Sequence, residues 1–221
     1  MLEGWRRIEA AIANVGACPE ALSARAELAA GIQGNFLAQY DASNAYLARA
    51  IERADAPDLE LIRAQALDWR GMNALRQGFT AEARAYLERA AEIQRRRNDS
   101  WGLSNTLNDI GCVVSDEEGG DDQVNARWYF EQSLELARHA EDRLAQAIAL
   151  QNLANSYPPG TPIISELIEQ SMALKRELGN PGGIANSLHN LGAAALGAND
   201  LESAKQYLVQ ALELYLRVGH R

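Results

Sequence analysis

Apolar residues recur at three- and four-residue steps along most of this chain, which is the period of an amphipathic α-helix. Two stretches show these steps clearly, at Ala83, Tyr86, Leu87, Ala90 and Ala91, and at Leu188, Leu191, Gly192 and Ala195. The apolar residues are mainly Ala and Leu, which lose little side-chain freedom in a helix. The pattern therefore predicts an all-α protein with almost no strand.

Two short blocks alternate along the sequence. The first is centred on a small residue, at Gly31, Gly71, Gly111, Ala154 and Gly192, and the second on Ala50, Ala90, Ser133, Ser171 and Ala211. Each second-block residue is followed 21 residues later by the next first-block residue. Within a repeat the spacing is 19 residues except where the turns at 116–122 and 157–162 change it. A fixed spacing of this kind indicates an internal repeat.

Each block lies in its own predicted helix, and small residues at the block centres allow two helix axes to approach closely. Counting 21 residues back from Gly31 gives Ala10, so a second-block helix is also expected at the start. We expect one array of about eleven helices over residues 1–221. It consists of an unpaired helix at 1–14 and helix pairs at 20–54, 59–97, 100–139, 142–178 and 182–218. Tyr46, Tyr86, Tyr129 and Tyr207 recur in register and are predicted to lie in the core.

The pairs Gly31/Ala50, Gly71/Ala90 and Gly192/Ala211, with Leu47, Leu87, Leu191 and Leu208 at the apolar positions, resemble the tetratricopeptide repeat. The resemblance implies a right-handed superhelical solenoid of antiparallel helix pairs. The period here is about 40 residues instead of the usual 34. In this it is similar to kinesin light chains and to the C-terminal repeat regions of bacterial LuxR-like and SARP-like signal-transduction ATPase regulators. Glu27 and Arg70 depart from the motif, because those positions are usually apolar.

In this family the first helix of each pair lines a concave groove that holds ligands. The resemblance implies groove positions at Gln65, Asp68, Trp69, Asn105, Asn108, Gln151, Asn152, Asn155, Asn186, His189 and Asn190. Many of them are amides, which can pair with a peptide backbone because each has a donor and an acceptor. The alternative is that these amides bond between neighbouring helices or to water. Trp69 is either a ligand anchor or a residue packed between helices.

Charge and motif content narrow the function further. The net charge of -9 argues against nucleic acid or an anionic membrane as the main partner. No apolar run is long enough to span a bilayer. Cys18 and Cys112 are far apart and lie outside any zinc motif, so we expect no metal, no cofactor and a reducing, cytoplasmic setting. The acidic turn at 116–122 lacks the spacing of a calcium-binding loop. No catalytic motif occurs, so we expect no enzyme.

We therefore expect a scaffold or sensor module that binds a protein or peptide in its groove, and the resemblance suggests that it is part of a bacterial transcriptional or signalling regulator. We expect both ends of the array to be open, because neither end carries the polar capping helix that solenoids normally have. The alternative hypothesis is a structural module that forms a homo-oligomer through these ends.

Overall fold

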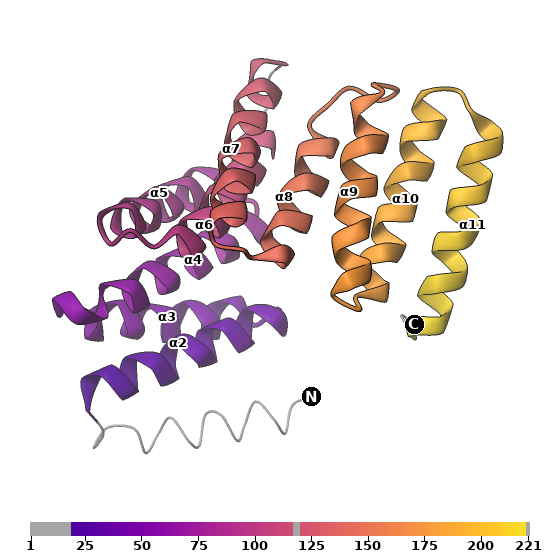
Figure 1. The fold of residues 1–221 in the computed structure, drawn as a ribbon. Helices are drawn as coiled ribbons and strands as arrows, with labels where there is room; N and C mark the ends of the chain where they lie inside the picture. The colour runs from indigo at the N-terminus through magenta and orange to yellow at the C-terminus, as the bar shows by residue number, and fades with distance from the viewer. Residues whose placement is uncertain (1–18, 117–119, 220–221) are drawn as a thin grey trace. The chain divides into compact units, whose positions relative to one another are not determined.

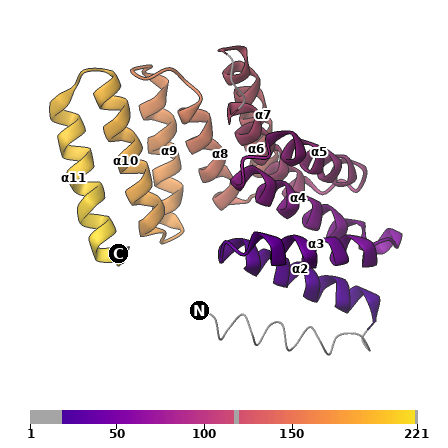
Figure 2. The same cartoon turned by 180° about the vertical axis from the view of Figure 1, so that it is seen from behind.

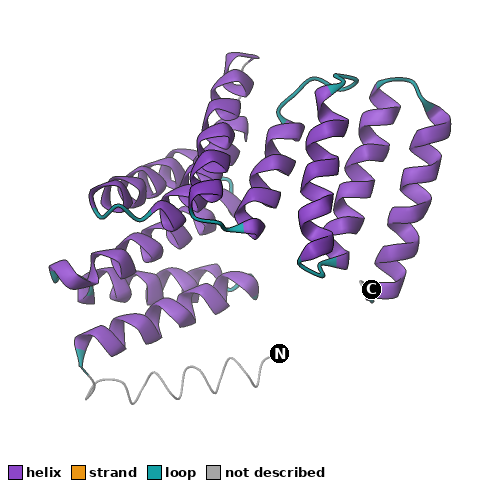
Figure 3. Cartoon of the chain, viewed as in Figure 1, coloured by secondary structure: helices purple, strands orange, loops and turns teal. Residues whose placement is uncertain are grey.

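The computed structural model describes residues 19–116 and 120–219, and in this part of the chain it contains helices and no strand (Figure 3). The α-helices are α2 (Glu20–Phe36), α3 (Tyr40–Arg53), α4 (Glu60–Arg76), α5 (Thr80–Arg96), α6 (Ser100–Asp116), α7 (Gly120–His139), α8 (Arg143–Asn155), α9 (Ile163–Glu177), α10 (Pro181–Gly197) and α11 (Leu201–Val218). One 3₁₀ turn, η2 (Pro57–Leu59), precedes α4. The all-α prediction is confirmed, and the expected helix at 1–14 lies outside the described residues.

The chain divides into two compact units, at residues 1–113 and 114–221. In the first unit α2 packs on α3 and α4 packs on α5, and α4 also contacts both α2 and α3. In the second unit each helix from α8 to α11 contacts the one before it, beginning with α7. Figures 1 and 2, which are seen from opposite sides, both show α8, α9, α10 and α11 side by side in chain order. Each unit is therefore built from successive helices that pack in series.

Glycines set the close approach of the two helices in three of the pairs. A Cβ atom at Gly31 would lie 2.5 Å from Leu47, and one at Gly71 would lie 2.6 Å from Leu87. Gly192 repeats this arrangement, at 2.7 Å from Leu208. In each case the leucine follows the glycine by 16 residues, so the sequence repeat corresponds to a repeated contact. The predicted role of the small first-block residues is confirmed at these three positions.

The second-block residues and their neighbours form the interior. The second-block positions Ala50, Ala90, Ser133, Ser171 and Ala211 are at most 2% exposed. One core cluster joins Ala24, Leu28, Leu47, Ala50, Ala54, Leu59, Ile62 and Ala66 from α2, α3, η2 and α4. Alanine dominates because helices this close leave little room for longer side chains. The core is therefore formed mainly at helix crossings.

The two departures from the repeat motif are explained by ion pairing and stacking. Glu27 is 3% exposed, and its carboxylate accepts hydrogen bonds from Arg49 (3.1 Å) and Arg53 (3.0 Å) of α3. Two cations compensate for the buried charge, which would otherwise be costly. The Arg70 guanidinium lies 4.5 Å from the ring centroid of Tyr86. Both polar residues thus contribute to packing between helices.

The recurring tyrosines are less buried than expected. Tyr46, Tyr86, Tyr129 and Tyr207 are all half-buried, so they border the core instead of lying fully inside it, and Tyr86 packs against one core cluster. The Tyr46 ring is covered by Arg49 at 4.5 Å, as Tyr86 is by Arg70. A guanidinium over an aromatic face covers the ring while leaving its hydroxyl near solvent. For Tyr46 and Tyr86, an arginine close in space therefore replaces the apolar cover that the pattern suggested.

The helices are joined by short turns of one recurring form. A residue with positive φ stands two positions before the next helix at Ala38, Gly78, Asn98, Glu141, Gly179 and Asn199. Side chains then cap several helices: Asp142 accepts from two backbone N–H groups of α8, Asn180 from Gly183, and Asp200 from Ser203. These caps satisfy N–H groups that lack partners at a helix start.

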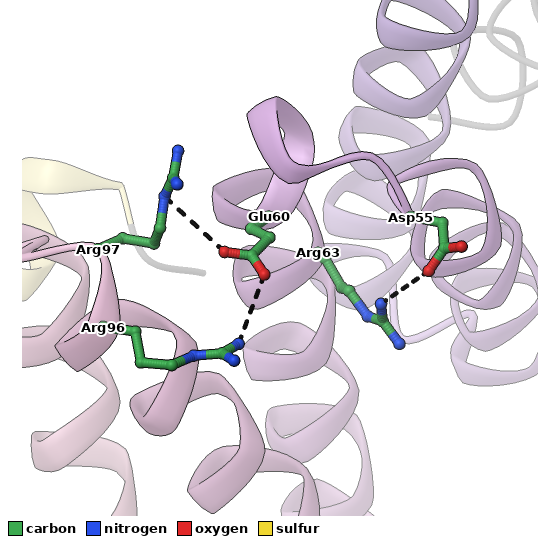
Figure 4. Close-up of polar contacts among 5 residues, drawn as sticks. All are labelled: Asp55, Glu60, Arg63, Arg96 and Arg97. Atoms are coloured by element: carbon green, nitrogen blue, oxygen red, sulfur yellow. Dashed lines mark hydrogen bonds and ion pairs between the residues drawn. The ribbon is translucent and has the colours of Figure 1, made fainter.

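Ion pairs also join the ends of the α4/α5 pair. Glu60 at the start of α4 receives Arg96 at 3.5 Å and Arg97 at 3.8 Å from the end of α5, and Arg63 pairs with Asp55 at 3.1 Å (Figure 4). The first helix begins where the second ends, so the pair is antiparallel. Such exposed pairs contribute little to stability, about 0–1 kcal/mol each.

Replacing Gly71 with valine should lower the free energy of unfolding by about 1–3 kcal/mol, because the new side chain would overlap Leu87 and force α4 and α5 apart. Chemical denaturation monitored by circular dichroism measures this change. Ala29→Val, at an exposed position of α2, is the matched control and should change stability much less. Equal stability of the two variants would contradict the close helix contact.

Candidate functional site

The eleven predicted groove residues lie on first helices of the repeats, in two groups. The first unit carries its five on α4 and α6: Gln65, Asp68, Trp69, Asn105 and Asn108. The second unit carries six on α8 and α10: Asn155 with Gln151 and Asn152, and His189 with Asn186 and Asn190. Each group is described within its own unit.

In the first unit Asp68 connects two first helices. Its carboxylate accepts a hydrogen bond of 2.7 Å from the Thr106 hydroxyl of α6. Asn105 donates instead to the backbone oxygen of Trp101 in its own helix, at 3.0 Å. Asn108 is 8% exposed, and its amide lies 3.4 Å from the Asp109 carboxylate. Several of the polar groups in this unit are therefore engaged in contacts within the protein.

Asp68 and Asp109 form a carboxyl pair on neighbouring helices. Burial raises the pKa of Asp68 to about 6, although the Thr106 hydrogen bond opposes this shift. Burial also raises the pKa of Asp109 well above its usual value, and the negative charge of Asp68 raises it further. The Asn108 amide and the Arg76 guanidinium act in the opposite direction. Sequence reasoning missed the pair because Asp68 and Asp109 come from different repeats.

Trp69 lies between the core and the surface. It is half-buried, and it packs against the core cluster of α2, α3 and α4. Its ring meets Phe36 edge-to-face, with centroids 5.5 Å apart. Phe36 itself is 65% exposed. Trp69 therefore has the packing role that was one of the two alternatives, while the pair also leaves aromatic surface accessible.

In the second unit Gln151 belongs to a buried polar cluster with Lys175 and Ser187. The Lys175 ammonium donates to the Gln151 side-chain oxygen at 3.1 Å and to the Ser187 hydroxyl at 2.9 Å. Ser187 in turn donates to Gln151 at 2.9 Å. Burial lowers the pKa of Lys175 to about 8. Gln151 therefore holds α8, α9 and α10 together, and its side-chain oxygen is engaged within the protein.

Both units use the same contact between successive first helices. In each case the donor is a hydroxyl residue five positions before the first-block residue of its own repeat. The acceptor is the side chain three positions before the first-block residue of the preceding repeat. Thr106 reaches Asp68 in this way, and Ser187 reaches Gln151. A Thr or Ser at this fixed position could have predicted the contact from the sequence, but only two of the repeats carry a hydroxyl residue there.

Asn155 and Asn190 lie together beside an open hollow. The Asn190 amide donates to the Asn155 side-chain oxygen at 3.2 Å. The hollow, which we call the α8–α10 hollow, has a volume of about 350 Å³, and its lining is mainly apolar: Ala154, Asn155, Tyr157, Pro159, Ile164, Ile168, Asn190, Ala193 and Ala194. Asn155 is exposed and Asn190 is half-buried, so both amides are within reach of a ligand.

The remaining predicted residues surround this pair or contact α11. His189 lies 3.4 Å from the Asn190 side-chain oxygen. Asn186 accepts a hydrogen bond from the Tyr215 hydroxyl of α11. Gln65 and Asn152 are both half-buried. The structure thus brings Asn155, His189 and Asn190 together at one place.

We also searched the described residues for metal sites and for membrane-spanning helices. These residues contain no group of three or more His, Cys, Asp or Glu side chains placed to hold a metal ion. None of their helices is both long and apolar enough to cross a membrane.

Asp68→Asn should flatten the pH dependence of stability. Because the folded-state pKa of Asp68 is raised to about 6, its contribution to stability is present below the unfolded value near 4 and is lost as the pH rises through 6. Asparagine keeps an acceptor for Thr106 without the charge, so stability at pH 7 should increase by about 1–2 kcal/mol. Denaturant unfolding at pH 4 to 7.5 measures this. Glu52→Gln, at an exposed site, should leave the profile unchanged.

Lys175→Met should also stabilise the protein at pH 7. With its pKa lowered to about 8, Lys175 loses its proton more readily when folded, so stability increases as the pH rises from about 8 toward 10.5. Methionine removes the buried charge and should remove this increase. Thermal unfolding between pH 7 and 10 measures both effects, with Arg89→Met at an exposed position of α5 as the control. A lower melting temperature at pH 7 would contradict the assignment.

The comparisons with known proteins concern repeat and fold. The tetratricopeptide repeat family model matches residues 185–216, which span most of α10 and α11. Among curated proteins, none matches this chain significantly. Among solved structures, BtubC (BKLC) from P. vanneervenii is similar over 98% of this chain and 89% of its own, with a TM-score of 0.76 and 16% identity.

A second similar structure is a putative kinesin light chain from Podosopora anserina with nearly identical TPR-like repeats. It matches over 89% of this chain and 97% of its own, with a TM-score of 0.62 and 15% identity. At these identities the likeness concerns the fold. The chain thus contains a tetratricopeptide repeat at residues 185–216, and its helices have the fold of tetratricopeptide-repeat proteins.

Proposed function

We propose that the protein is a non-catalytic binding module that holds an extended peptide segment of a partner protein at the α8–α10 hollow. The observation that carries the proposal is the position of Asn155 and Asn190 at the edge of a mainly apolar hollow of about 350 Å³. Ligand sites typically combine an apolar surface with a few polar groups that fix orientation.

The two amides suit a peptide backbone. Asn190 uses one N–H to bond Asn155, which leaves the Asn155 amide group and a second lone pair on its oxygen for a ligand. A backbone C=O and N–H can pair with them whatever the side chains of the peptide are. The contact between them holds both amides in place before binding, and this lowers the entropy cost of association.

The hollow gives the site its selectivity. Ile164 and Ile168 are buried at its base, while Tyr157 and Pro159 come from the turn between α8 and α9. The Arg127 guanidinium lies 4.8 Å from the Tyr157 ring centroid and helps to fix this ring. An apolar side chain of the peptide is therefore preferred in the hollow, because a charged one would lose its hydration there.

Other predicted groove residues enter the proposal differently. His189 lies beside Asn190 and extends the polar edge of the site. Asp68, Asn108, Trp69 and Gln151 serve helix packing first, and we assign them no direct role at this hollow. A place in a bacterial transcriptional or signalling regulator is a further part of the proposal, since the repeat type resembles that of such regulators.

The replacement of both Asn155 and Asn190 by alanine should weaken peptide binding at least about tenfold, since two or more hydrogen bonds to the backbone are lost. The probe is a random peptide library displayed on phage, selected on the whole chain, with affinities of synthesised winners measured by calorimetry. We expect the winners to share one apolar position. Ala193→Phe, which places a ring in the hollow, should block the same peptides.

Asn105→Ala, in the first unit, is the matched control and should bind these peptides as well as the unchanged protein does. Circular dichroism must show equal helicity for all variants. Winners that bind the double alanine variant with full affinity would place the peptide site elsewhere.

A further inference from the structure

The helix α11 carries an apolar surface that no described residue covers. Leu201, Val209, Leu212 and Leu216 are 65%, 47%, 58% and 69% exposed, and we call these four residues the α11 face. Val209, Leu212 and Leu216 follow each other at steps of three and four residues, so they lie on one side of the helix. Apolar residues grouped in this way on a helix indicate a packing surface.

The repeat shows which part of this face is unusual. Leu212 directly follows the second-block residue Ala211, and the equivalent residues Ala91, Leu134 and Met172 are all buried, at 1%, 7% and 7% exposure. An apolar residue at this position is therefore a general property of the second helices. Leu212 alone therefore indicates a packing partner for α11 but does not distinguish a following helix from another chain.

Val209 and Leu216 differ from the residues at the same positions in α5, α7 and α9. At the position of Val209, helices α5, α7 and α9 carry the exposed residues Glu88, Glu131 and Glu169. At the position of Leu216 they carry the exposed residues Arg95, Arg138 and Arg176. Charged residues stay in water at these two positions when a following helix pair packs normally. The α11 face is thus wider than another repeat would need.

The charges beside the face have an order that fits a second copy of the same helix. Going along α11, the exposed charged residues are Glu202, Lys205, Glu213 and Arg217, alternating in sign. If two copies of α11 pack antiparallel, with Val209 of one near Leu212 of the other, Lys205 comes opposite Glu213 and Glu202 comes opposite Arg217. Two-fold symmetry makes each of these pairs occur twice. Parallel packing would instead place like charges together.

We propose that the α11 face binds the α11 face of a second copy of this chain, forming an antiparallel two-fold homodimer. Val209 and Leu212 form the centre of the contact, Leu216 lies over the aliphatic part of Lys205, and the ion pairs set the direction. One helix from each copy provides less area than a standard stable interface of about 1,200–2,000 Å². The dimer is therefore a concentration-dependent one.

Sedimentation velocity of the whole chain between about 1 and 100 µM tests the proposal, over the range in which a small interface associates. The mass should rise from 24.1 kDa toward twice that value. Leu212→Glu should keep the protein monomeric throughout, and Leu178→Glu, which is exposed at 43% near the end of α9, should not. A chain that stays monomeric up to 100 µM, or a dimer that Leu212→Glu leaves intact, would overturn the proposal.

A charge exchange separates this arrangement from any other pairing. Lys205→Glu and Glu213→Lys should each weaken the dimer, because each places like charges opposite one another twice. The combination of both substitutions restores the opposite charges and should return the dissociation constant to within about threefold of the original. A double variant as weak as the single ones would rule out antiparallel pairing in this register. Peptide binding, measured on the same variants, should not change, so this test is independent of the proposed peptide site.

Discussion

The contact between a glycine of one helix and a leucine of the next determines how this protein is built. It recurs at Gly31, Gly71 and Gly192, where there is no space for even a methyl group. Helices held this close must fill the remaining space with alanine and serine. Longer and more polar side chains then extend from the crossing, toward other helices or toward solvent.

The fold was largely predictable because its determinants are local. The glycine–leucine contact joins residues only 16 positions apart, so it leaves a regular trace in the sequence. Tyr46 and Tyr86 were placed too deep because Arg49 and Arg70 cover their rings, and a periodic pattern does not contain the direction of those arginine side chains. Whether all repeats act as a single array remains a prediction, since the chain divides into two compact units.

The candidate site was predictable only in part. Register alone placed Asn155 and Asn190 on successive first helices, where they do meet. It could not distinguish them from Gln151, which lies one helical turn before Asn155 in α8 but meets Lys175 and Ser187 from two other helices. The hollow depends on the path of the turn around Pro159, and this path is not encoded in the repeat. A residue's neighbours, more than its position in the repeat, decide between structural and binding roles.

The turns have a consequence for how this sequence can change over time. Ala38 and Glu141 adopt the left-handed backbone conformation, with φ of 55° and 54°, where the turns at Gly78 and Gly179 use glycine. An L-residue with a side chain pays about 1 kcal/mol for that conformation. Glycine at either position would release this strain, and neither residue belongs to the proposed peptide site. Substitution by glycine at these turns would therefore stabilise the fold. Such a gain can compensate for destabilising mutations that change the ligand preference.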